Sequence, residues 1–258
     1  MSKKRKPIIN WILFLATVVV VFLLGLLASS ITERRAEVAA TYKPEVKIKE
    51  WEPRNEVWGK NFPTEYDSYQ MNDESNFASK YNGNAMIDML EVDPRLVVLW
   101  AGYGFSKDYN QGRGHTYDIQ DLRNTLRTGG PKDENDGPMP STCWTCKSPD
   151  VPRVMNEQGV KEFYTGKWAR LGAEIVNPIG CADCHNNETM ELQISRPALA
   201  EAFERMGKDI NDATHQEIRS LVCAKCHVEY YFDKKRPGAE GSAYLTFPWD
   251  KGMSVEEM

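Results

Sequence analysis

Three short cysteine segments carry the residues most able to do chemistry in this 258-residue chain. They read CWTCK (143–147), CADCH (181–185) and CAKCH (223–227), and together they hold all six cysteines. Residues i, i+3 and i+4 share one face of a helix, so two thiols can each bond a haem vinyl group while the next side chain reaches the iron. The two Cys-x-x-Cys-His segments therefore predict covalent haem c, with His185 and His227 as proximal iron ligands.

Three other uses of Cys-x-x-Cys pairs compete with this interpretation. Zinc ribbons usually place their pairs roughly 15–20 residues apart. Here 34 residues separate Cys146 from Cys181, and 38 separate Cys184 from Cys223. Redox dithiols of the thioredoxin kind need a βαβ context, which the sequence does not offer. Structural disulfides would suit an oxidising compartment but would not explain the two histidines, so haem attachment accounts for most of the observations.

The first segment differs from the others because Lys147 stands where they have histidine. Lysine binds iron only as the neutral amine, and its ordinary pKa of about 10.4 means that burial and the metal must displace a proton. A haem with lysine on one side and no ligand on the other would offer an open position to a substrate, whereas two histidine ligands indicate electron transfer. On the residues alone, an ordinary exposed lysine after a disulfide is an equal alternative.

The N-terminus indicates the compartment in which these segments reside. Residues 1–35 hold six Lys or Arg and one Glu, a net charge of +5, which leaves −10 on residues 36–258. The apolar stretch from Ile8 to Ser29 is long enough, at about 1.5 Å per helical residue, to cross a bilayer core. The basic residues before it favour a cytoplasmic N-terminus and an exported body. We expect an anchor in the inner membrane and a periplasmic body, with a cleaved signal peptide as the alternative.

Composition and patterning limit the fold class. Apolar residues make up 41% and charged residues 27%, which excludes a disordered chain and a polytopic membrane protein. A sequence pI of about 5.5 excludes a basic nucleic-acid binder. Because alternation of period two is scarce, we expect a mainly α fold with extensive loops, and haems that supply much of the apolar core. Helices are expected over 198–206 and 213–222, and a surface loop over 129–140.

The same features divide the chain into parts. The expected parts are a basic cytoplasmic tail (1–7), a transmembrane anchor or signal sequence (8–29), a charged linker (30–57) and a haem-binding domain (58–258).

The chain resembles the ammonia-forming cytochrome c nitrite reductases, multihaem enzymes of the bacterial periplasm. The resemblance runs from about residue 58 to the C-terminus, and four segments carry it: RGHTYDIQDLRNTLRTGGPKDENDGPMPSTCWTCKSPDVPR (113–153), NPIGCADCHNN (177–187), HQEIRSLVCAKCHVEYYFD (215–233) and FPWDKGM (247–253). It implies a multihaem cytochrome c fold preceded by one N-terminal transmembrane helix. Full-length members carry five haems, four of them with two histidine ligands, and the haem at Cys-x-x-Cys-Lys performs the six-electron reduction of nitrite to ammonium.

The resemblance implies catalytic roles for three residues. Lys147 would be the proximal ligand of the catalytic haem, which Cys143 and Cys146 would bind. Arg127 matches an arginine that borders the distal pocket and would hold nitrite by charge-assisted hydrogen bonds. Tyr230 matches a pocket tyrosine that would relay protons. On the residues alone, Arg127 would be a surface arginine before a Gly-Gly turn.

Further matches concern metal ligands. His115 would be the distal ligand of the haem held by Cys223 and Cys226, while no distal ligand is identified for the haem held by Cys181 and Cys184.

A calcium site is also implied. Glu229 and the backbone carbonyl of Tyr230 match ligands of Ca²⁺, which prefers hard oxygen donors. A helix end packing on haem is the alternative for this pair. His215 matches a helix that leads into the third segment, and we expect it to form hydrogen bonds rather than to bind iron.

The chain departs from the family in length. Full-length members are nearly twice as long, and two further haem segments and a Lys-x-Gln-His segment are missing here. Ser254 and Glu257 have the spacing of a helix capping box just before the last residue, so we expect an N-terminal portion of the enzyme.

The resemblance also implies partners for the full-length enzyme. These are nitrite, a quinol-oxidising membrane cytochrome or soluble multihaem electron donor, and a second copy in a homodimer. No nucleic-acid partner is expected. The alternative function is a membrane-anchored multihaem cytochrome that transfers electrons without catalysis.

Overall fold

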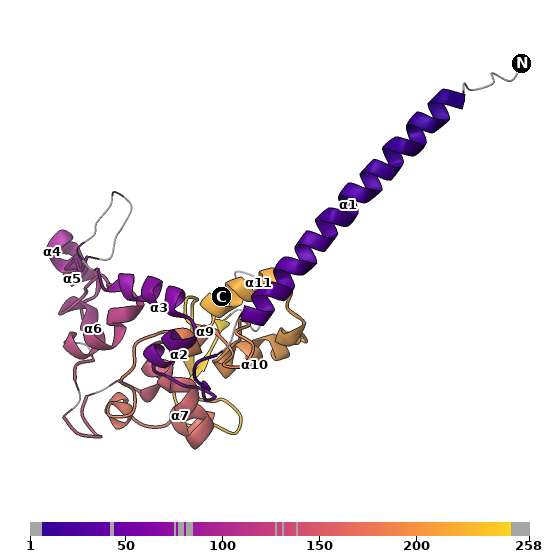
Figure 1. Cartoon of the computed structure of the whole chain (residues 1–258). Helices are drawn as coiled ribbons and strands as arrows, with labels where there is room; N and C mark the ends of the chain where they lie inside the picture. The colour runs from indigo at the N-terminus through magenta and orange to yellow at the C-terminus, as the bar shows by residue number, and fades with distance from the viewer. Residues whose placement is uncertain are drawn as a thin grey trace, which may run out of the picture. The chain divides into compact units, whose positions relative to one another are not determined.

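The computed structural model describes residues 7–41, 44–74, 76, 80, 85–126, 128–130, 132–137 and 139–248 (Figure 1). The chain divides into two compact units, Met1–Glu45 and Val46–Met258. Helices and loops make up nearly all of the described residues. The expected mainly α fold with an apolar N-terminal helix is therefore confirmed.

The first unit, in its described residues, holds one helix, α1 (Pro7–Thr41), of 35 residues. At about 1.5 Å per residue it is roughly 52 Å long. Its segment Ile8–Glu37 contains an 18-residue window with a mean hydropathy of 2.9 and is exposed throughout, so by length and composition it could cross a membrane. The helix continues past Ser29 into the segment expected to be a linker. The reason is that residues 30–41 contain neither glycine nor proline and are rich in alanine, glutamate and arginine, which favour helix.

The second unit begins within the same predicted linker. The Val46 N–H donates to Asn61 Oδ1 at 2.9 Å, and Asn61 Nδ2 donates back to the Val46 carbonyl at 2.8 Å. Ile48 is buried, and Trp58 Nε1 donates to the Glu52 carbonyl at 2.9 Å. Residues 46–57 are thus packed into the folded unit despite their charged composition, because their backbone groups have partners there.

Short helices joined by loops build the second unit. Its α-helices are α2 (Asn55–Asn61), α3 (Pro63–Gln70), α4 (Met89–Val92), α5 (Arg95–Leu99), α6 (Asp118–Asn124), α7 (Asp150–Gln158), α8 (Val160–Phe163), α9 (Cys181–Cys184), α10 (Pro197–Arg205) and α11 (His215–Ala224). Its 3₁₀ helices are η1 (Met71–Asp73), η2 (Gly104–Ser106), η3 (His115–Tyr117), η4 (Ser141–Cys146), η5 (Trp168–Leu171) and η6 (Ile210–Asp212). The helices expected over 198–206 and 213–222 are α10 and α11, each shifted by one or two residues.

The described part of the unit holds one small sheet. Strand β1 (Tyr231–Asp233) pairs antiparallel with β2 (Tyr244–Thr246), so that Tyr231 lies opposite Thr246. The side chains of β2 are buried, and β2 contacts α10. The sheet therefore attaches the chain that follows the third cysteine segment to the core.

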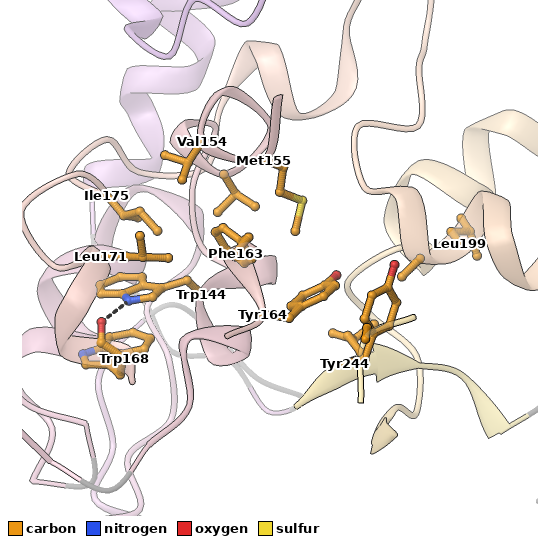
Figure 2. Close-up of a cluster of buried hydrophobic side chains, with 14 of the residues drawn as sticks. Trp144, Val154, Met155, Phe163, Tyr164, Trp168, Leu171, Ile175, Leu199 and Tyr244 are labelled. Atoms are coloured by element: carbon orange, nitrogen blue, oxygen red, sulfur yellow. Dashed lines mark hydrogen bonds between the residues drawn. The ribbon is translucent and has the colours of Figure 1, made fainter. Parts of the chain in front are cut away.

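The main apolar core surrounds the first cysteine segment. Trp144 and Trp168 stack with ring centroids 3.3 Å apart and planes 7° from parallel, and Trp144 Nε1 donates to the Trp168 carbonyl at 2.8 Å (Figure 2). Other buried members of this core are Val154, Met155, Phe163, Tyr164, Leu171, Ile175, Leu199 and Tyr244. The first segment thus belongs to the core through its tryptophan.

Candidate functional site

The first cysteine segment forms the 3₁₀ helix η4, which is fastened to the core. Ser141 Oγ donates to the Phe163 carbonyl at 2.6 Å, and Thr142 Oγ1 donates to the Ala243 carbonyl at 2.5 Å. In a 3₁₀ helix residues i and i+3 eclipse one another, so Cys143 and Cys146 lie on the same side. The spacing argument predicted this shared side, and the structure provides it with a tighter helix than the α-helix assumed.

The second cysteine segment forms the single turn α9, which contacts α2 (Figure 1). The Cys181 N–H donates to Asn55 Oδ1 at 2.9 Å, and a Cβ on Gly180 would lie only 1.9 Å from that oxygen. His185 Nδ1 lies 2.8 Å from the Met190 carbonyl. Because a carbonyl only accepts, Nδ1 is the donor in this contact, which leaves Nε2 as the nitrogen that could bind a metal.

The third cysteine segment ends helix α11. The helix begins with a capping box, in which Thr214 Oγ1 accepts from the Glu217 N–H and the Glu217 carboxylate accepts from the Thr214 N–H. At its other end the His227 N–H donates to the Cys223 carbonyl at 2.8 Å. This bond continues the helical turn, so His227 follows the two cysteines as the spacing requires.

Two histidines that are 112 positions apart in the sequence face each other. The rings of His115 and His227 have centroids 6.0 Å apart, and their planes are inclined by 44°. His115 begins η3, directly after Gly114, whose φ of 97° favours glycine. Burial, and then the nearby His227, lower the pKa of His115, so its imidazole is neutral, as a metal ligand must be.

Residues of the first and third segments line one large cavity. It has a volume of about 1090 Å³, and its lining includes Cys143, Lys147, His227, Glu229 and Tyr230. The volume slightly exceeds the range of about 300–1,000 Å³ that is usual for ligand pockets. Residues that the sequence analysis selected on separate grounds thus share one cavity.

Aromatic side chains form another wall of this cavity. Tyr103 and Phe105 line it, and Phe105 packs on Trp100 and Tyr109 with centroids 5.1 and 5.4 Å apart. An apolar wall beside thiols suits a large flat ligand better than a small ion.

The remaining predicted site residues have different positions. Tyr230 is 45% exposed on the rim of the large cavity. His215 is exposed at the start of α11 and lines a separate cavity of about 800 Å³ with Met190 and Gln193. Arg127 lies outside the described residues, although the neighbouring Thr128 lines the large cavity.

Asp118 is a notable residue that the sequence analysis did not select. It begins α6, and Asp118 and Lys147 both line a cavity of about 460 Å³. Burial raises the pKa of Asp118 to about 8, and the charge of Asp183 adds to the shift while the Ile119 N–H opposes it. Its position three residues after His115 was visible in the sequence, but its burial was not.

The chemistry of the donor groups fits haem c better than a metal ion bound by side chains. No disulfide joins the six cysteines, all of which are described. Over the described ranges, no three His, Cys, Asp or Glu side chains gather around one point. A zinc ribbon needs such a cluster, whereas thioether attachment needs only two thiols on one side of a helical turn and a ligand beside them.

The first and third segments also touch through their sulfurs. A hydrogen bond between the thiols of Cys146 and Cys226 lowers the pKa of Cys146 to about 7, and it raises the pKa of Cys226. The two segments are therefore immediate neighbours in space.

Comparisons with known proteins agree with this arrangement. A family model described as Cytochrome c552 matches residues 54–258. The cytochrome c-552 of Parabacteroides distasonis is 58% identical over 259 residues, and that of Bacteroides fragilis is 56% identical over 259 residues. Each alignment covers all of this chain and 51% of the relative. The chain thus spans about half the length of the curated relatives it matches.

A solved structure is also similar. The catalytic subunit of cytochrome c nitrite reductase from Desulfovibrio desulfuricans, described for its two calcium sites, superposes with a TM-score of 0.73 at 33% identity. The match covers 82% of this chain and 47% of that subunit. The helical fold and its Cys-x-x-Cys segments define a c-type cytochrome. The chain belongs to the cytochrome c552 family, that of the ammonia-forming cytochrome c nitrite reductases.

Proposed function

We propose that this chain carries the nitrite-reducing centre of an ammonia-forming cytochrome c nitrite reductase, together with haem sites that deliver electrons to it. The observation that carries the proposal is the shared cavity of about 1090 Å³, where Lys147 and Tyr230 lie with residues of two cysteine segments. Haem c, bound there, would supply an iron that accepts single electrons and can bind a small anion.

The ligand residues divide between two tasks. The ring centroids of His115 and His227 are 6.0 Å apart, a separation at which both imidazoles could hold one haem iron. This separation supports a bis-histidine site for electron transfer, attached through Cys223 and Cys226. His185, oriented by the Met190 carbonyl, would serve the segment of Cys181 and Cys184 in the same way.

Lys147 would serve the catalytic site, attached through Cys143 and Cys146. A lysine amine donates a lone pair to iron only in its neutral form, so iron binding at Lys147 would have to displace a proton. Lys147 would thereby hold the iron to which nitrite would bind.

Two further residues would handle the substrate and its protons. The Tyr230 hydroxyl would donate a hydrogen bond to an anionic substrate and pass on protons from solvent, since it lies on the exposed rim. Arg127, proposed on the resemblance, would attract the anion. Local positive charge is needed because the body beyond residue 35 carries −10.

A calcium ion would stabilise this rim. Glu229 and the carbonyl of Tyr230 would supply oxygen ligands, which Ca²⁺ prefers. The D. desulfuricans relative was described with two calcium sites, which supports the proposal of a calcium site in this chain.

The location and partners follow from the first unit and the family. Helix α1 would anchor the protein to the inner membrane, with the body in the periplasm. A quinol-oxidising membrane cytochrome or a soluble multihaem protein would supply the electrons, and the full-length enzyme would form a homodimer.

Mass spectrometry and optical spectroscopy test this proposal. The chain is produced in a periplasm that has a haem c maturation system, and haem is counted from the intact mass and the pyridine haemochrome spectrum. We expect three haems, one of which changes its absorption when nitrite is added to the reduced protein.

A matched pair of variants identifies the responding site. Lys147→His should keep three haems but change the nitrite-dependent absorption, because the ligand of the responding iron differs. Lys161→His, at an exposed site on α8, should leave both the haem count and the nitrite response as in the wild type. Three haems without any nitrite response would favour the electron-transfer cytochrome. An intact mass equal to that of the polypeptide without haem would exclude both the nitrite reductase and the electron-transfer cytochrome.

A further inference from the structure

One fully buried arginine connects the cysteine segments. Arg196 precedes α10 and is 1% exposed. Its Nε donates to the carbonyl of Thr145 at 2.6 Å, and its Nη2 donates to the carbonyl of Ser148 at 2.7 Å. The same Nη2 pairs with Asp183 Oδ1 at 2.5 Å. Thr145 lies in the first segment, Ser148 directly follows it, and Asp183 lies in the second segment. One guanidinium therefore connects the first and second segments.

The third segment enters the same network through Lys225. This lysine is 2% exposed, and its Nζ donates to the Asp183 carbonyl and, at 2.9 Å, to Ser195 Oγ. Ser195 Oγ also accepts from Arg196 Nη1 at 2.8 Å. The second variable position of the Cys-x-x-Cys spacing therefore contributes to the network, because Asp183 occupies it in the second segment and Lys225 in the third.

Arginine has the chemistry that this position demands. Its planar guanidinium offers five N–H donors in a fixed fork, and here it serves four acceptors from separate parts of the chain. Lysine has one nitrogen and could not reach these acceptors together. A buried network with this many satisfied partners holds its members in one arrangement.

The network also places a permanent positive charge between the segments. A guanidinium stays protonated in proteins, and Asp183 is the acidic side chain paired with it. An electron that reaches a nearby iron adds negative charge, and a buried cation stabilises that state because the surroundings screen charge weakly.

We propose that Arg196 is a positioning residue of the haem cluster: it fixes the three attachment segments relative to one another and raises the reduction potentials of the haems they hold. The inference rests on the haem attachment proposed above. It adds a role for a residue that would contact neither substrate nor iron.

Redox titration of the matured protein tests this role. Midpoint potentials are measured spectroelectrochemically for wild type, Arg196→Gln, Arg196→Lys and the control Arg205→Gln. Arg205 lies at the other end of α10, where it hydrogen-bonds Thr246 and pairs with Glu201. We expect Arg196→Gln to lower at least one potential, Arg196→Lys to lower it less, and Arg205→Gln to leave all potentials unchanged.

Asp183→Asn should shift the reduction potentials in the opposite direction, and it therefore provides an independent test. It removes the negative partner and leaves the cation, so the potentials should rise, which general structural damage would not produce together with the fall in Arg196→Gln. If the Arg196→Gln variant does not attach haem, the reduction potentials of Asp183→Asn and Arg196→Lys still test the role of Arg196.

The outcomes separate the two proposals. Three haems in the wild type with potentials that do not respond to Arg196→Gln, or that fall in Asp183→Asn, would overturn the role of Arg196 and leave the proposed function intact. A wild-type protein without haem would overturn the proposed function and, with it, this inference.

Discussion

The first and second cysteine segments share a spacing but are held in different ways. The first, in η4, is fastened by apolar packing, above all by the stack of Trp144 on Trp168 (Figure 2). The second, in α9, is fastened by hydrogen bonds: the Cys181 N–H donates to Asn55 Oδ1, and His185 Nδ1 donates to the Met190 carbonyl. The comparison teaches that the Cys-x-x-Cys spacing sets where the thiols lie, while the surrounding residues set how firmly the next side chain is aimed.

This difference matches the chemistry proposed for each segment. A histidine that must bind iron through one nitrogen gains from a hydrogen bond that fixes its other nitrogen. A lysine has a flexible four-carbon stem and a single nitrogen, so its aim depends on the walls of the cavity. Apolar packing adds to the hydrogen bonds of Ser141 and Thr142 in holding the first segment, whereas a hydrogen bond orients the histidine of the second.

The largest expected effect comes from breaking the packing of the first segment. Trp144→Ala removes a fully buried indole and leaves Trp168 without its stacking partner, which should lower the free energy of unfolding by about 3–5 kcal/mol. Urea unfolding followed by circular dichroism measures this loss. Val98→Ala, at a site 78% exposed, is the control and should change stability by less than about 0.5 kcal/mol. A loss for Trp144→Ala as small as that of the control would contradict the comparison.

A smaller effect is expected when the second segment is crowded. The new methyl of Gly180→Ala would meet Asn55 Oδ1, so we expect a loss of about 1–3 kcal/mol. Gly112→Ala is the matched control because its Cβ would meet nothing within 4 Å.

A double-mutant cycle assigns this loss to one contact. Adding Asn55→Ala removes the clashing oxygen, so the double variant should lose less stability than the two single variants together. Additive losses would show that the contact with Asn55 is not the cause.

Asp118 is influenced by charges of both the first and the second segment. Asp183 raises the pKa of Asp118, and Lys147 lowers it. Its pKa of about 8 exceeds its unfolded value of 3.8, so the folded protein binds the extra proton between these values. That stabilisation is complete below about pH 4 and is lost as pH rises through 8.

Asp118→Asn tests this pH dependence. The stability of wild type relative to the variant should fall between pH 4 and 8, by at most about 1.4 kcal/mol per pH unit. Melting temperatures across this range measure it, and the exposed Asp133→Asn should show no such trend. A difference independent of pH would mean that Asp118 is ionised in the folded protein.

The smallest effect concerns a hydrogen bond behind the second segment. Tyr69 Oη donates to the Ile179 carbonyl at 2.9 Å, and burial raises the pKa of this phenol to about 12. Tyr69→Phe should lower the free energy of unfolding by about 1 kcal/mol. Tyr66→Phe is the matched control, since its ring stacks on Tyr69 with centroids 6.4 Å apart. An equal loss in both variants would exclude the hydrogen bond as the cause.

Much of the fold was accessible from local patterns. The apolar run of α1, the helices α10 and α11 and the scarcity of strands are visible in the order of residue types. The end of α1 and the start of the second unit were not, because the charged composition of residues 30–57 resembles a linker although the Val46 backbone pairs with Asn61.

The candidate site shows the same division. Thiols three residues apart lie together in any helical turn, so the sequence by itself determined the attachment chemistry and the lysine that distinguishes one segment. Which segments are neighbours was decided only by the tertiary structure, because contacts such as Cys146 with Cys226 join residues 80 positions apart. Burial was decided there too, and it converts Arg196 into a link between segments and Asp118 into an acid that keeps its proton near neutral pH. The physical reason is that spacing is a property of one turn, whereas burial and charge depend on everything packed around a residue.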